Sequence, residues 1–193
     1  GPAIAFDHWQ TFRPTSCGKA VDRMEIRIDS SDPFNQVGEI LTKGMNVMDG
    51  YYNNPEASNT VLSPDGWLHT GDLGVLDPDG YLYIKGRSKS LILGPSGQNI
   101  YPEEIEDLLN AQPYIAESLV IEREGKLVAL VYPDAEAMKQ NKISCETLLK
   151  IIHETRKQIN QQLPAYSQIA RIEIHDEEFE KTPKRSIKRF LYQ

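Results

Sequence analysis

The stretch WLHTGDLGVLDPDGYLYIKGR, residues 67–87, decides the fold of the first half of the chain. Two apolar runs, residues 73–76 and 81–86, flank the turn sequence DPDG, in which proline and the Asp-Gly pair supply the backbone angles of a tight turn. This pattern predicts a β-hairpin. Upstream, residues 23–30 alternate apolar and charged side chains, and residues 38–44 follow after a polar turn, which predicts an antiparallel pair of half-buried strands.

The second half of the chain has a different pattern. After Arg87 an apolar run leads through a loop of glycine, proline and serine into a helix that begins near Pro102, where proline and two glutamates suit a first helical turn. Strands are expected at residues 117–122, 126–133 and 170–176. Residues 145–163 predict a helix with an apolar stripe that comprises Leu148, Leu149, Ile152 and Ile159.

These patterns together predict an α+β fold in two parts. We expect a β-rich, barrel-like subdomain over residues 1–87 and a small α+β domain over residues 88–193, with the boundary between Gly86 and Ser90. A length of 193 residues is compatible with two compact units that each have a core.

Composition excludes several classes of protein. With 21 basic and 28 acidic residues the formal charge is -7, the wrong sign for binding a nucleic-acid backbone. The two cysteines form no CxxC pair, and the four histidines have no metal-ligand spacing, so neither a disulfide framework nor a zinc site is indicated. No apolar run reaches the roughly 20 residues that span a bilayer. We expect a cytoplasmic protein whose partner is not a nucleic acid.

Asp72 and Arg87 are the first candidates for chemistry. Asp72 lies where an extended segment enters the predicted hairpin, and a short acidic side chain at such a place can accept two hydroxyl hydrogen bonds from a ribose diol. Because a hairpin returns the chain close to its start, Arg87 can line the same cleft and help to hold a nucleotide. The alternatives are that Asp72 braces the turn and that Arg87 forms a surface ion pair.

Two further segments are candidates for ligand contacts. The loop GPSGQN, residues 94–99, could let a ligand pass close to its backbone or could be a plain entry to the following helix; it is not a phosphate loop. The tail concentrates five cations, at positions 181, 184, 185, 188 and 189. If the tail is extended, Lys184, Ser186 and Lys188 point to one side, although a basic tail is usually solvated surface.

Five motifs in order resemble the C-terminal stretch of the adenylate-forming acyl-CoA synthetases. They are GEILTKGMNVMDGYYNNPEAS (38–58), DGWLHTGDLG (65–74), GYLYIKGRSKSLIL (80–93), PSGQNIYPEEIE (95–106) and KTPKRSIKR (181–189). The sequence of residues 93–106 and the C-terminal sequence of the chain are most similar to the corresponding sequences of the long-chain fatty acyl-CoA ligases. The resemblance implies a two-step reaction, in which a carboxylate and ATP give acyl-AMP and pyrophosphate, and the thiol of coenzyme A then displaces AMP. It also implies Mg²⁺ bound with the ATP.

The resemblance assigns roles to individual residues. Asp72 and Arg87 match the residues that bind the ribose of ATP and of the acyl-adenylate. Lys89 falls at the hinge about which such enzymes rotate their C-terminal domain. Ser96 and Gly97 match the loop beside the pantetheine tunnel of coenzyme A.

Two departures from the family pattern matter. The family's phosphate loop and its aromatic-Gly-x-Thr-Glu motif are absent from the sequence, so we expect a fragment that does not catalyse adenylation alone. In addition, Ser186 stands where the family has its adenylation lysine. A hydroxyl cannot stabilise developing phosphate charge as an ammonium does. Lys188, or alternatively Lys184, could take that role. Activation of another carboxylic acid, or a non-catalytic nucleotide-binding homologue, are the alternatives.

Overall fold

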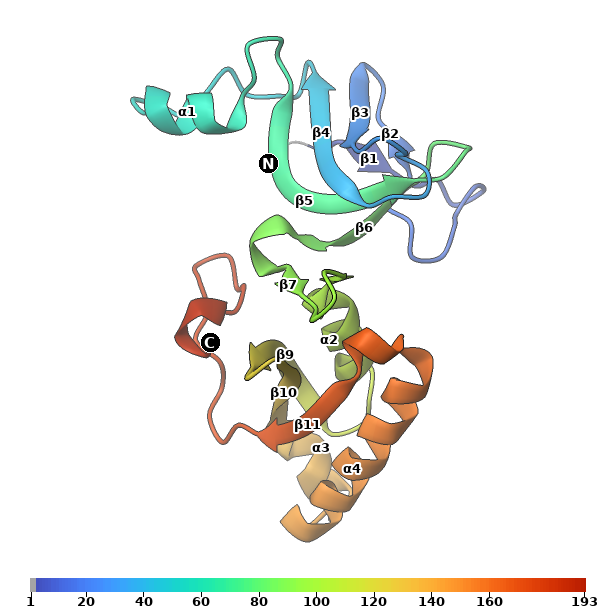
Figure 1. Cartoon of the computed structure of the whole chain (residues 1–193), viewed down its shortest axis with the longest axis vertical. Helices are drawn as coiled ribbons and strands as arrows, with labels where there is room; N and C mark the ends of the chain where they lie inside the picture. Colours follow the sequence, from blue (N-terminus) through green and yellow to red (C-terminus); the bar gives the residue numbers. More distant parts are fainter. Residues whose placement is uncertain (1–2) are drawn as a thin grey trace. The chain divides into compact units, whose positions relative to one another are not determined.

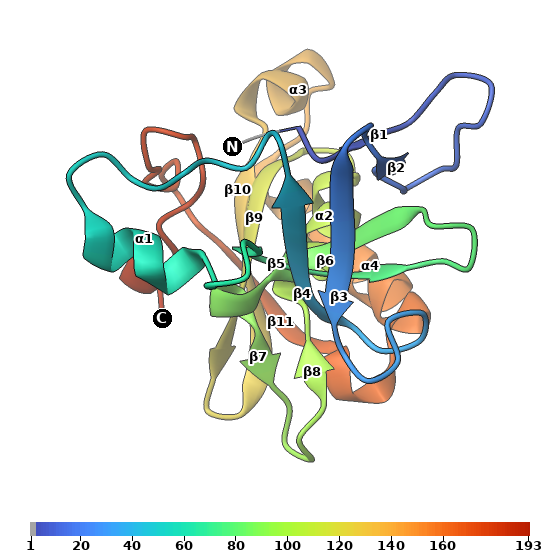
Figure 2. The ribbon, with the colours of Figure 1, turned by 90° about the horizontal axis from the view of Figure 1, so that it is seen from above.

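The computed structural model describes residues 3–193, and the chain divides into two compact units with the boundary between Lys89 and Ser90. Figures 1 and 2 label the helices and strands of the two units. Each unit has its own core, and the α+β class expected from the sequence is confirmed.

The first unit is built on an open antiparallel sheet in the order β3-β4-β5-β6 (Figures 1 and 2). Its strands are β3 (Met24–Asp29), β4 (Gly38–Gly44), β5 (Leu68–Leu76) and β6 (Leu82–Arg87). The predicted strand pair and the predicted hairpin are therefore confirmed. A barrel-like sheet was wrong: β3 and β6 are the two ends of an open sheet, because residues 3–23 form only the short pair β1 (Ala5–Phe6) and β2 (Lys19–Ala20).

Helix α1 (Pro55–Val61) lies in the connection between β4 and β5 and was not expected from the sequence. None of its residues is buried, so it has no apolar stripe to reveal it. Its start is nevertheless well defined, because the side chain of Asn54 accepts a hydrogen bond from the Ala57 amide and Pro55 occupies the first turn.

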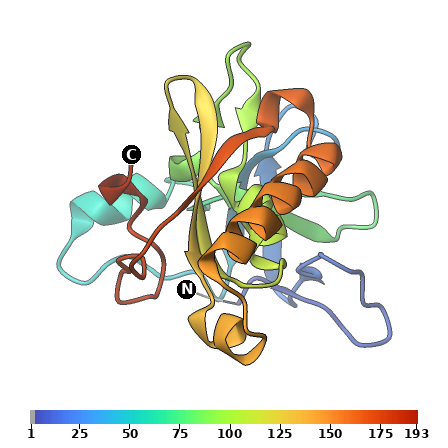
Figure 3. The same cartoon turned by 90° about the horizontal axis from the view of Figure 1, so that it is seen from below.

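The second unit combines a three-stranded sheet in the order β11-β10-β9 with helices on one face. Figure 3 shows α4 lying along one side of this sheet. The short helix η1 (Ser88–Ser90) spans the boundary between the units, and the elements that follow it in chain order are β7 (Ile92–Leu93), β8 (Asn99–Ile100), α2 (Pro102–Asn110), β9 (Ile115–Arg123), β10 (Lys126–Pro133), α3 (Ala135–Gln140), α4 (Cys145–Gln162), η2 (Ala165–Ser167), β11 (Ile169–Ile174) and η3 (Arg189–Leu191). Strands β9 and β10 pair antiparallel, whereas β10 and β11 pair parallel.

Strand β10 is apolar almost throughout because both of its faces are buried. Ala129 and Val131 face the core formed with α2 and α4, whereas Val128 and Leu130 pack with Phe179 of the C-terminal segment. The C-terminal segment thus covers the face of the sheet opposite the helices. Packing of Phe179, Ile187 and Tyr192 against the sheet holds this segment, which carries the candidate lysines.

The stripe predicted for α4 is correct at three of its four positions. Leu148, Ile152 and Ile159 are buried, but Leu149 is 55% exposed. Buried positions along this helix are spaced by three or four residues, and the residue adjacent to Leu148 falls about 100° further round the helix. Thr155, which is polar, occupies the fourth buried position instead.

Within residues 3–193, no helix is long and apolar enough to cross a membrane. Over the same range, no three His, Cys, Asp or Glu side chains gather as a metal site would require.

Candidate functional site

The hairpin of β5 and β6 brings the two predicted ribose contacts together. Asp72 and Arg87 are direct register partners across the two strands, and Arg87 Nε lies 2.9 Å from Asp72 Oδ1. Their side chains are 32% and 63% exposed. A carboxylate that accepts hydrogen bonds and a guanidinium that donates them therefore share one accessible position at the end of the hairpin.

The backbone before Asp72 is held in an unusual conformation. Gly71 has φ 72°, in the left-handed region that glycine adopts without the strain of a β-carbon. Its amide donates to Glu39 Oε1 at 2.9 Å, and the other oxygen of that carboxylate lies 2.8 Å from His69 Nδ1. The Gly71 carbonyl accepts from the Ser88 hydroxyl at 3.2 Å.

Thr70 adds a second tie to the same segment. Its hydroxyl donates to the Ile40 carbonyl at 2.7 Å and accepts from the Asp72 amide at 3.1 Å. The register between β4 and β5 is interrupted between Glu39 and Leu41, so side chains take over the pairing that the strand ladder leaves open. Neither Glu39 nor Thr70 was singled out from the sequence; the only signal was a glutamate inside the strand sequence GEILTKG.

The predicted hinge residue, Lys89, is exposed in η1 and is the last residue of the first unit.

The loop at residues 94–98 connects β7 and β8, so it is the turn of a short hairpin rather than a direct entry to a helix. The Gly97 amide donates to the Gly94 carbonyl at 2.9 Å, and Gly97 has φ 81° with open space where a β-carbon would stand. Pro95 and Ser96 form the exposed tip. Helix α2 begins two residues after β8 ends.

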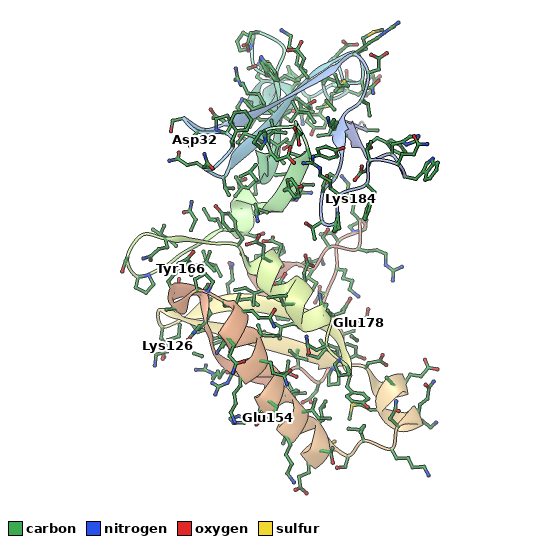
Figure 4. All side chains as sticks on the ribbon, turned by 90° about the vertical axis from the view of Figure 1, so that its right-hand side faces the viewer. Asp32, Lys126, Glu154, Tyr166, Glu178 and Lys184 are labelled. Carbon is green, nitrogen blue, oxygen red and sulfur yellow. The ribbon has the colours of Figure 1, made fainter. Side chains whose placement is uncertain are left out.

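A cavity of about 590 Å³ lies beside this hairpin, within the second unit. Ser96 and Gln98 line it from the loop, Lys126 lines it from the start of β10, and Tyr166 lines it from η2. Figure 4 labels Lys126 and Tyr166. Gly97 is not among its lining residues. A cation, an aromatic ring and one of the two predicted loop residues therefore line the same cavity.

The basic tail is not extended, so the condition under which Lys184, Ser186 and Lys188 would point to one side is not met. Lys181 and Ile187 form an antiparallel bridge, and the Thr182 amide donates to the Ser186 carbonyl at 2.8 Å. The chain therefore reverses in a tight turn with the exposed Lys184 at its tip (Figure 4). Pro183, at the start of the turn, and Arg185, with φ 63°, favour the reversal.

Lys188 lies on the return of this turn. Its amide donates to the Glu180 carbonyl at 2.8 Å, and its Nζ lies 3.1 Å from Glu180 Oε2. The Lys188 side chain is 33% exposed. Of the two candidate lysines, Lys188 is therefore the one whose backbone is fixed by pairing.

Arg189, the next residue, anchors this segment to the core of the second unit. Its Nη2 pairs with Glu106 Oε2, and its Nη1 donates to the Val120 carbonyl at 3.3 Å. Glu106 also accepts from the Val120 amide at 2.6 Å. Burial raises the pKa of the Glu106 carboxyl, and the charge of Arg189 opposes that rise. This buried pair was missed in the sequence, where Arg189 belonged to a tail read as solvated.

Comparisons with known proteins show which proteins this chain is similar to. An indoleacetate–CoA ligase of Aromatoleum aromaticum is 44% identical over 124 residues, which is 60% of this chain and 24% of the relative. A long-chain-fatty-acid–CoA ligase of Gallus gallus is 39% identical over 123 residues, or 63% of this chain and 16% of the relative. The O-succinylbenzoate coenzyme A synthetase of Bacillus subtilis in complex with AMP has a TM-score of 0.73 at 29% identity, covering 94% of this chain and 36% of that one.

These proteins act on different acids, as their names state, and the indoleacetate enzyme has the highest identity of the three. The comparisons therefore support an acid–CoA ligase family, and they do not support a particular likeness to its long-chain branch. The chain spans about a quarter of the indoleacetate ligase and about a third of the succinylbenzoate enzyme. Residues 89–192 match the family model described as the AMP-binding enzyme C-terminal domain, and the chain belongs to that family.

Proposed function

We propose that this chain is the C-terminal part of an acid–CoA ligase, which forms an acyl-adenylate from a carboxylic acid and ATP and then an acyl-CoA. The accessible Asp72–Arg87 pair is the observation that carries the proposal. Its carboxylate can accept hydrogen bonds from a ribose diol, its guanidinium is a cation beside that carboxylate, and the chain belongs to an AMP-binding family. In this proposal residues 1–87 end the large N-terminal domain and residues 88–193 form the mobile lid.

Nucleotide binding in this proposal begins with the ribose. The Asp72 carboxylate accepts hydrogen bonds from the two ribose hydroxyls, and Arg87 donates to the sugar oxygens from the neighbouring strand. The bacterial relative whose structure contains AMP supports the ligand class. Mg²⁺ would accompany the phosphates of ATP and neutralise their charge. We assign no residue of 3–193 to it, because no acidic cluster of the kind a metal needs occurs there.

The second step requires coenzyme A to reach the adenylate. We assign Ser96 and Gly97 to the loop that borders its pantetheine arm, and Lys89 to the pivot about which the lid turns between the two steps. The exposed hairpin tip and the absence of a side chain at Gly97 support a close approach of ligand to backbone. The cavity next to Ser96 gives room beside that approach.

Adenylation also needs a cation on the transferring phosphate. We assign this role to Lys188, because pairing fixes its backbone, whereas Lys184 stands at the tip of an exposed turn and Ser186 carries no charge. The Lys188 ammonium must leave Glu180 to reach a nucleotide, and an ion pair with this exposure is weak enough to exchange.

For the substrate we propose a long-chain fatty acid, with an aromatic acid as the second candidate. The Gallus gallus relative supports the first and the indoleacetate–CoA ligase supports the second. The test is pyrophosphate release by the intact protein with carboxylic acids of graded chain length and with aryl acids. A steady rise in kcat/KM with chain length supports the first substrate, and preference for aryl acids contradicts it.

A different class of function is a nucleotide-binding homologue without ligase activity, which the replacement of the family lysine by Ser186 favours. Pyrophosphate release separates the two. A protein that binds AMP and releases no pyrophosphate with any acid of the panel is the homologue, and a protein that does release it is a ligase.

A further inference from the structure

We propose that Glu39 is a positioning residue for Asp72, and that it sets the geometry of the Asp72–Arg87 pair and through it the affinity for a ribose. This inference rests on the proposed function only for its nucleotide part. Glu39 lies on β4, the strand that pairs with β5, and its side chain contacts His69 and the Gly71 amide rather than Asp72 or Arg87.

The two carboxylate oxygens of Glu39 bind two different groups of β5. Oε1 accepts from the Gly71 amide at 2.9 Å, and Oε2 lies 2.8 Å from His69 Nδ1. A carboxylate only accepts hydrogen bonds, so the imidazole donates through Nδ1 in this contact. Glu39 thus fixes the backbone at the residue before Asp72 and a side chain three residues before it.

The hydrogen bond from Gly71 to Glu39 lies where the pairing of β4 with β5 is interrupted. The register of β4 against β5 is interrupted between Glu39 and Leu41, and Gly71 lies opposite that interruption with φ 72°. Without the Glu39 carboxylate the Gly71 amide loses its hydrogen-bond acceptor, because the interrupted strand pairing offers no backbone carbonyl in its place. The left-handed conformation of Gly71 then loses the hydrogen bond that holds it. A rotation at Gly71 redirects the side chain of the next residue, which is Asp72.

The Thr70 hydroxyl does not replace Glu39. It binds the Asp72 amide and the Ile40 carbonyl, and so it holds the backbone on either side of Gly71 without contacting the Gly71 amide. The two ties are complementary: Thr70 fixes the position of the segment, and Glu39 fixes the peptide orientation within it.

Glu39→Ala and Glu39→Gln test the inference in the 193-residue chain, with Glu25→Ala and Glu25→Gln as matched controls. Glu25 is an exposed glutamate of β3 in the same sheet, opposite Lys43 rather than β5. Glutamine keeps one acceptor oxygen and so satisfies one of the two donors, which makes Glu39→Gln the informative variant if Glu39→Ala does not fold.

Three NMR readouts are measured: amide hydrogen exchange at Gly71, the Arg87 Nε–H signal, and the dissociation constant for AMP from shifts at Asp72 and Arg87. We expect Glu39→Ala to raise the rate of amide hydrogen exchange at Gly71 by about tenfold and the dissociation constant for AMP by about tenfold. Changes of this size are typical when a hydrogen bond to a charged group is lost. The Arg87 signal should shift or broaden, Glu39→Gln should give smaller changes of the same sign, and the Glu25 variants should match the wild type.

The outcomes separate this inference from the proposed function. An unchanged Arg87 Nε–H signal in a folded Glu39→Ala variant overturns the positioning role, and so does a wild-type affinity for AMP in a variant whose Gly71 amide has been released. If the wild-type chain shows no saturable shifts with AMP at millimolar concentration, the nucleotide role fails. The Arg87 signal then decides alone whether Glu39 sets the geometry of the pair.

Discussion

Asp72 and Arg87 stand directly opposite each other on β5 and β6, with Arg87 Nε 2.9 Å from Asp72 Oδ1 and both side chains accessible. An ion pair with this exposure contributes little to folding, with typical values of about 0–1 kcal/mol. The register of the hairpin therefore places two opposite charges at an accessible position. There they can bind a ligand that has both hydrogen-bond donors and hydrogen-bond acceptors.

Replacing Asp72 by alanine should separate binding from stability. We expect the free energy of unfolding to change by less than about 1 kcal/mol, because the ion pair is exposed, and AMP binding to be lost. Urea unfolding and an AMP titration of the same samples measure the two effects. Arg23→Ala, which removes an exposed arginine of the same unit, is the control. A large loss of stability in Asp72→Ala would favour the turn-brace reading instead.

Gly71→Ala should impair the site through the backbone alone. A β-carbon at Gly71 meets only Ser88 Oγ, at 4.0 Å, so the cost is that of a left-handed conformation, about 1–2 kcal/mol. Gly80→Ala is the matched control, because Gly80 has φ 85° and open space around it but lies in the turn of the hairpin. Both variants should lose similar stability in urea unfolding, and only Gly71→Ala should weaken AMP binding. Equal affinities would show that the Gly71 conformation does not matter to the ligand.

Arg189→Leu should destabilise the protein in a pH-dependent way. Breaking a buried ion pair leaves the Glu106 charge unpaired and costs about 3–5 kcal/mol near neutral pH. Burial already holds the native pKa of Glu106 above its ordinary value of 4.5, and loss of Arg189 raises it further.

The sign of the pH effect follows from that pKa. A carboxyl whose native pKa is raised binds more protons when folded, so stability falls as pH rises from 4.5 through the native pKa. Urea unfolding at pH 5 and pH 7 should therefore show a larger loss for Arg189→Leu at pH 7. The exposed Lys150–Glu146 pair supplies the control Lys150→Leu, expected to change stability by less than about 1 kcal/mol at either pH. A loss independent of pH would mean that Arg189 acts by packing alone.

Lys188→Ala should lower the rate of adenylation in the intact protein more than Lys184→Ala. The loss of an ammonium from the transferring phosphate is expected to cost about 10²–10³-fold in kcat, as for other groups that stabilise transition-state charge. Ser186→Lys, which restores the family residue, should rescue part of that loss in the Lys188→Ala background. Unchanged pyrophosphate release in both alanine variants would refute substitution by either lysine.

The sequence predicted the elements that are marked by a regular spacing of apolar residues or by residues typical of turns and helix starts. The DPDG hairpin, strand β10 and the start of α2 at Pro102 are local features, and the structure confirms each of them. The pairing of Asp72 with Arg87 followed from the same hairpin. Helix α1 was missed because it buries no residue, so no apolar stripe marks it.

Contacts between distant segments were beyond the reach of local patterns. Glu39 lies 32 residues from Gly71, and Arg189 lies 83 residues from Glu106. The alternating positions of Lys184, Ser186 and Lys188 would face one side only in an extended tail, but Pro183 and the left-handed Arg185 reverse the chain. Tertiary packing on Phe179 and the Arg189 ion pair then fix the tail on the sheet.

The most direct measurement of the ribose claim is an NMR titration of the 193-residue chain with AMP and, in parallel, with 2′,3′-dideoxy-AMP. Recognition of the diol by Asp72 and Arg87 predicts weak, saturable shifts at both residues with AMP and their loss with the dideoxy nucleotide. Equal shifts with the two nucleotides, or shifts confined to residues remote from β5 and β6, would contradict it.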